Sequence, residues 1–143
     1  MTHAASLLTA LAKSPLGEAM RAALDPRAVL DDAIAIQQIP APTFQEAERA
    51  AYVASRFQAA GLQDVTCDAE HNVYGRWPGA NPSAPALLVC AHTDTVFPAG
   101  TDLTIRHEEG CVYGPGLGDN SAGVAGLLDV LGLWRAVNFR PPV

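Results

Sequence analysis

The chain has 143 residues, 49% of them hydrophobic, which fits one ordinary domain with a real core. A formal net charge of -6 argues against nucleic acid and anionic membranes as partners. No stretch reaches the roughly 20 apolar residues of a membrane span, and the start lacks a basic leader segment. The three cysteines contain no CxxC pair, so we expect a reducing, cytoplasmic setting.

The first part of the chain, about residues 3–60, is predicted to be helical. Residues 3–24 place leucines and a methionine at roughly helical spacing, and the Ser14-Pro15 step breaks or restarts the helix. Asp25 followed by Pro26 is typical of an N-cap with proline at the first helical position. A further helix is therefore expected to begin there.

The segment IPAPT, residues 39–43, is predicted to be a turn. Thr43 and Glu46 then have the spacing of a capping box, which predicts a helix over about residues 44–60. Gly61 stands where a left-handed C-terminal cap belongs.

The rest of the chain, about residues 63–143, is predicted to hold a sheet and the loops that carry chemistry. Short strands are expected at residues 65–67 and 72–77, and a hairpin at residues 103–113 with HEEG as its solvated tip. A last helix is expected to open at Asn120 or Ser121.

The run ALLVCA, residues 86–91, is apolar without alternation, which predicts a strand buried on both faces with Cys90 inside the core. Helices followed by strands and a final helix indicate the α/β class. We expect a three-layer mixed sheet with helices on both faces, and one partial domain that spans residues 1–143.

His92 and Asp94 follow this buried run directly. Side chains two positions apart on an extended strand point to the same side, and a carboxylate can hold a metal-bound histidine through its second ring nitrogen. The ends of strands in α/β sheets are also where such folds bind ligands. A structural histidine at a strand end is the alternative explanation.

A second stretch, GPGLGDNSAG at residues 114–123, carries Asp119 after three glycines. Glycines allow a close approach of the backbone, and one aspartate has two oxygens that can bridge two cations. The alternative is an ordinary N-cap at Asp119 or Asn120. The stretch lacks the Lys-Ser/Thr of a phosphate-binding loop.

Together, HTDTVFP and GPGLGDNSAG resemble the zinc-dependent exopeptidases and deacylases that include carboxypeptidase G, peptidase T, aminoacylase and acetylornithine deacetylase. The segments IPAPTFQEAERAAYVASRF, AGLQDV and HNVYGRWPG are also similar to the N-terminal region of that family. The resemblance runs from about Asp25 to Trp134. It implies a two-metal hydrolase that cleaves peptide or N-acyl amide bonds of small peptides or N-acyl amino acids, as a homodimer.

The resemblance also implies roles for single residues. His92 matches the first metal ligand, Asp94 the acid that orients this histidine, and Asp119 the carboxylate between two Zn²⁺ ions, followed by a cis peptide bond. Co²⁺ or Mn²⁺ can share such ligands with zinc.

The general base and the remaining ligands of that family have no counterpart in the sequence, because Glu108-Glu109 precedes Asp119 instead of following it. We therefore expect an N-terminal fragment of a metallohydrolase, which alone binds metal weakly and does not catalyse. One half of a split enzyme and a noncatalytic α/β binding module are the alternatives.

Overall fold

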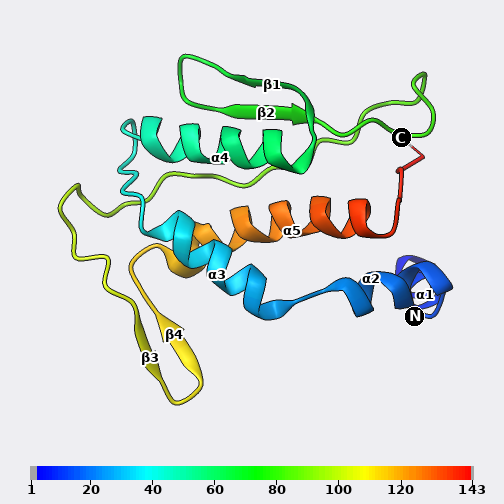
Figure 1. Cartoon of the computed structure of the whole chain (residues 1–143), viewed down its shortest axis with the longest axis horizontal. Helices are drawn as coiled ribbons and strands as arrows, with labels where there is room; N and C mark the ends of the chain where they lie inside the picture. Colours follow the sequence, from blue (N-terminus) through cyan, green and yellow to red (C-terminus); the bar gives the residue numbers. More distant parts are fainter. Residues whose placement is uncertain (1–2, 143) are drawn as a thin grey trace.

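The computed structural model describes residues 3–142, which form helices and two small antiparallel sheets (Figure 1). Within this range no helix is long and apolar enough to cross a membrane. The elements, in chain order, are α1 (His3–Ala12), α2 (Pro15–Ala23), α3 (Pro26–Gln37), α4 (Ala47–Ala60), β1 (Gln63–Cys67), β2 (Val73–Arg76), β3 (Arg106–Glu108), β4 (Cys111–Tyr113), the short π-helical turn η1 (Leu117–Ser121) and α5 (Ala122–Ala136).

The first helices begin where the sequence predicts. Ser14 caps α2, with its hydroxyl accepting the amide of Gly17 at 3.1 Å. Asp25 caps α3 by accepting the amide of Arg27 at 2.9 Å, and a proline follows each cap. These caps satisfy amide groups that have no partner inside the helix, which explains the break between α1 and α2.

The start of α4 differs from the prediction. The helix begins at Ala47, and no side chain caps it. Phe44 has a positive φ of 70°, and its amide donates to the Glu46 carboxylate at 2.7 Å. The predicted capping box does not form, because α4 begins three residues later than expected, and the Thr43 hydroxyl donates to the Asp94 carboxylate instead. The other end is confirmed: Gly61 ends α4 in the left-handed conformation, with φ 86°.

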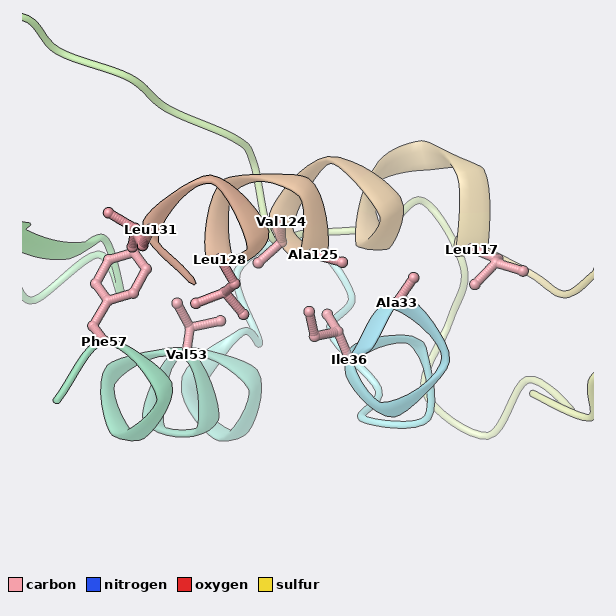
Figure 2. Packing of buried hydrophobic residues seen from close by; sticks show 9 residues of the cluster. All are labelled: Ala33, Ile36, Val53, Phe57, Leu117, Val124, Ala125, Leu128 and Leu131. Carbon is pink, nitrogen blue, oxygen red and sulfur yellow. The ribbon is translucent and has the colours of Figure 1, made fainter. Parts of the chain in front are cut away.

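The core lies where α5 packs against α3 and α4, and Figure 2 shows side chains from these three helices pointing toward one another. Ile36 is fully buried between α3 and α5, and Phe57 closes the end nearest Leu131. The nine buried residues of this cluster are Ala33, Ile36, Val53, Phe57, Leu117, Val124, Ala125, Leu128 and Leu131.

The predicted three-layer mixed sheet does not form within residues 3–142. β1 pairs with β2 and β3 with β4, both antiparallel, and the two pairs belong to separate sheets. The β1–β2 hairpin packs on α4 (Figure 1). A single parallel bridge, between Pro42 and Thr95, is the remaining strand-like contact in this range.

The prediction for residues 86–91 is also wrong. This segment runs unpaired, with Leu87 68% and Leu88 79% exposed, and Cys90 is exposed as well. An apolar strand is buried only when neighbouring strands and helices cover it, and no other described strand lies against this segment. The segment therefore leaves an apolar surface next to the candidate site.

Asp129, on α5, is expected to lower the stability of the fold near neutral pH. Partial burial and the charges of Asp32 and Asp25 raise the pKa of its carboxyl group. A raised pKa in the folded state means that ionisation weakens folding, so the penalty is absent at low pH and appears as the pH rises past the unfolded value. We expect Asp129→Asn to raise the Tm at pH 7 and to leave it unchanged near pH 3.

Thermal unfolding at the two pH values measures this effect. Asp31→Asn, an exposed change on α3, is the matched control and is expected to change the Tm little at either pH. An equal gain at both pH values would show that charge is not the cause.

Candidate functional site

The candidate site brings together the two stretches that the sequence singles out. His92 lies between two carboxylates: its Nδ1 is 3.1 Å from Oδ1 of Asp94, and its Nε2 is 3.0 Å from Oδ1 of Asp119. These residues come from the loop after residues 86–91 and from the turn η1 that opens into α5. His92 is therefore in contact with both of the other predicted site residues.

The glycine-rich loop brings Asp119 to His92. Gly116 has φ 69°, and a Cβ there would meet Cγ2 of Thr95 at 2.8 Å, so only glycine fits without a shift. The peptide bond between Asp119 and Asn120 is cis, as the family resemblance implies. Asn120 donates from Nδ2 to the carbonyl oxygen of His92 at 3.2 Å, which ties the two loops together.

Asp94 is held from two sides. The Thr43 hydroxyl donates to its Oδ2 at 2.9 Å, and the His92 ring faces its Oδ1. The Thr43 hydrogen bond is the main cause that lowers the pKa of Asp94, and the bond to His92 adds to it. Asp94 is therefore an ionised acceptor, which favours the tautomer of His92 with the proton on Nδ1.

In that tautomer the lone pair of His92 Nε2 faces an oxygen of Asp119. A nitrogen lone pair and a carboxylate oxygen at 3.0 Å repel each other unless a proton or a metal cation lies between them. Two donors bound to one tetrahedral zinc ion, each at about 2.0–2.1 Å, are roughly 3.3 Å apart. The donor types and their spacing therefore fit a shared metal ion.

Water can reach the site. The side chain of Asp119 is 90% exposed and that of His92 is 53% exposed, whereas Asp94 behind them is 34% exposed. Within residues 3–142, no group of three or more histidine, cysteine, aspartate or glutamate side chains is placed to hold a metal ion. His107, Glu108 and Glu109 lie exposed at the end of β3 and in the turn that follows it, as the sequence predicts for a solvated tip.

Sequence reasoning missed two residues near this site, Thr43 and Arg49. Thr43 has the pattern of a helix cap, which hides its contact with Asp94, 51 positions away. Arg49 is 2% exposed, and it shares the buried face of α4 with Val53 and Phe57. Spacing in steps of four puts an arginine on an apolar stripe, and this signal is visible in the sequence.

Gly123 is expected to be sensitive to substitution because it leaves room for Asn120. A Cβ at Gly123 would lie 2.0 Å from Oδ1 of Asn120, so Gly123→Ala must displace that side chain. We expect the variant to lose the hydrogen bond from Asn120 to His92 and to bind a metal ion more weakly, while the fold is kept. Gly126→Ala, where a Cβ meets nothing within 4 Å, is the control.

Cobalt titrations of the two variants measure this difference. Equal cobalt affinities would mean that the contact of Asn120 with His92 does not hold the site together.

The chain is similar to a known protein family over part of its length. Residues 72–142, just under half of the chain, match the model of Peptidase family M28, and the matched range includes His92, Asp94 and Asp119. No curated protein matches the chain. Members of this family generally use zinc. The match supports a hydrolase of the zinc-dependent metallopeptidase type. It does not support the particular enzymes named above, such as carboxypeptidase G and aminoacylase.

Proposed function

We propose that this chain forms the N-terminal part of a two-metal hydrolase, which cleaves peptide or N-acyl amide bonds of small peptides or N-acyl amino acids. The observation that carries the proposal is the placement of His92 between Asp94 and Asp119. The match to a zinc-dependent peptidase family over the same residues supports it.

His92, Asp119 and Asp94 would each have a separate role in the metal site. Nε2 of His92 and one oxygen of Asp119 would hold a first metal ion, and the second oxygen of Asp119 is available to a second. By accepting from Nδ1, Asp94 would favour the tautomer whose Nε2 lone pair can bind a metal ion. When bound, zinc supplies a Lewis acid that polarises the scissile carbonyl and lowers the pKa of a bound water.

The remaining ligands and the acceptor of the water's proton would come from a further segment or a second polypeptide. The exposed apolar segment at Leu87 and Leu88 supports this view, because such surface is normally covered in a finished domain. From the net charge of -6 we propose an enzyme without nucleic acid or membrane partners. From three cysteines without a CxxC pair we propose a cytoplasmic location. From the family resemblance we also propose that the complete enzyme is a homodimer.

A cobalt titration followed by proton NMR tests the metal site. Co²⁺ is paramagnetic and shifts the ring protons of a histidine that it binds. We expect shifted signals for His92, and unshifted signals for His71 and His107 at the same cobalt concentration. Binding is expected to be weak, since structural and catalytic zinc sites normally have three or four protein ligands. Unshifted His92 signals at saturating cobalt would refute the metal site.

A further inference from the structure

Arg49 is an unusual arginine because its whole side chain is buried. It is 2% exposed, and it lies in the first turn of α4, where the helix dipole disfavours a positive charge. Burial lowers its pKa. Among the described residues it forms no ion pair within 4.0 Å, so a desolvated cation is kept without a carboxylate bound to it.

The guanidinium group binds two backbone carbonyls from different segments. Its Nε donates to the carbonyl of Ile39 at 2.9 Å, and one terminal nitrogen donates to the same oxygen. The other terminal nitrogen, Nη1, donates to the carbonyl of Thr93 at 2.7 Å. Thr93 is the residue between His92 and Asp94, so Arg49 fixes the backbone that presents both side chains.

A second set of contacts joins the same two segments. The amide of Thr95 donates to the carbonyl of Ala41 at 2.8 Å, and the amide of Thr43 donates to the carbonyl of Thr95 at 3.2 Å. The Thr43 hydroxyl then reaches the carboxylate of Asp94. The turn at residues 39–43 thus binds the loop of His92 through backbone hydrogen bonds along one edge. On the buried side, Arg49 joins the same turn and loop by binding one carbonyl of each.

The charge of Arg49 also has a partner of opposite sign nearby. The Asp94 carboxylate is the one group whose charge opposes the lowering of the Arg49 pKa. The charge of Asp94 therefore partly offsets the cost of burying the Arg49 cation. A purely structural clamp between two carbonyls would not require a buried charge.

We propose that Arg49 is a positioning residue for the metal site: it fixes the backbone of Thr93 so that His92 and Asp94 keep their common orientation. The inference deepens the proposed function and rests on it. Arg49 touches neither metal nor substrate, and its effect passes through the loop. The planar fork of arginine is essential, since one lysine nitrogen has no such geometry with which to bridge both carbonyls.

Three variants test this role. Arg49→Met removes the charge and the fork, and Arg49→Lys keeps the charge but loses the fork. Arg56→Met is the matched control on the same helix, because it removes the ion pair of Arg56 with Asp32, at 2.6 Å, and that pair lies away from the loop. Urea unfolding in the presence of chelator gives the stability of each variant, and cobalt titration gives its metal affinity.

We expect both Arg49 variants to bind Co²⁺ at least about tenfold more weakly, a loss typical for groups that support metal ligands. Arg56→Met is expected to keep the original cobalt affinity even where it lowers stability. A visible cobalt absorption band of altered shape in Arg49→Lys would report the changed orientation of His92.

The outcomes separate this inference from the proposed function. If the unaltered chain shows no cobalt binding at His92, the proposed function fails and the inference fails with it. If the chain binds cobalt and Arg49→Lys binds it equally well, the inference alone is overturned. An equal loss in Arg56→Met, or folding of Arg56→Met but of neither Arg49 variant, also rejects a positioning role in favour of general stability.

Discussion

Replacing His92 by alanine is expected to abolish binding of Co²⁺ and Zn²⁺ by this chain. The site offers one imidazole nitrogen and the carboxylate of Asp119, so the variant leaves only a carboxylate that is 90% exposed. A single exposed carboxylate holds such metals poorly, since zinc sites are built from several ligands. The loss should exceed the roughly 10–100-fold that removal of an outer-shell partner costs.

Two further variants provide an intermediate loss of metal affinity and a control. Asp94→Asn leaves both direct ligands in place but removes the ionised acceptor for Nδ1, so its loss is expected to fall within about 10–100-fold. His107→Ala, at an exposed position of β3, is expected to leave the cobalt affinity unchanged. Isothermal titration with Co²⁺ measures all three variants. Retained binding in His92→Ala would mean that the metal sits elsewhere on the chain.

Replacing Ile36 by alanine is expected to cost about 2–5 kcal/mol of unfolding free energy, the range for large-to-small changes in a core. Ile36 is 0% exposed and lies between α3 and α5, where Figure 2 shows it facing Val124 and Ala125. The helices cannot close around the lost atoms without moving, so a cavity remains. The folded state of a domain is only about 5–15 kcal/mol more stable than the unfolded state, so we expect the variant to lose a large share of its stability.

Leu88→Ala is the matched control for this change, since Leu88 is 79% exposed. It removes about as much apolar side chain but from the surface, so we expect almost no loss in urea unfolding. If Leu88→Ala costs as much as Ile36→Ala, residues 86–91 are covered in solution by another molecule. Repeating the measurement at several protein concentrations would then show whether that molecule is a second copy.

The helical part of the fold could be predicted from the sequence because its signals are local. Ser14 and Asp25 stand immediately before the helices that they cap, and Gly61 directly follows the helix that it ends. Such signals depend on neighbouring backbone groups alone. The β3–β4 hairpin was equally predictable, since its turn residues lie between the strands that they join.

The failures arise where a distant partner decides the structure. The apolar pattern of residues 86–91 indicates burial, but burial requires strands on both sides, and local sequence does not supply them. Thr43 has the local pattern of a cap, yet it binds Asp94, 51 positions away. The helix begins at Ala47, too far along the chain for Thr43 to cap it, and the tertiary contact with Asp94 cannot be read from local sequence.

The three residues of the candidate site could be predicted from the sequence, whereas the residues that position them could not. Residue type, spacing and family resemblance singled out His92, Asp94 and Asp119. The structure places His92 within hydrogen-bonding distance of both Asp94 and Asp119. Arg49 remained hidden because its partners are carbonyl groups, which leave no trace in a sequence. Its position on the apolar stripe of α4 was the one available hint.

The bridge between Pro42 and Thr95 has a consequence for the order of folding. Caps and helical turns form between residues close in sequence, whereas the bridge closes a long loop, and long loops cost more entropy before they gain contacts. We therefore expect α3 and α4 to form early and the loop of His92 to dock late. His92 and Asp119 would then come together as a pair only in a nearly finished fold.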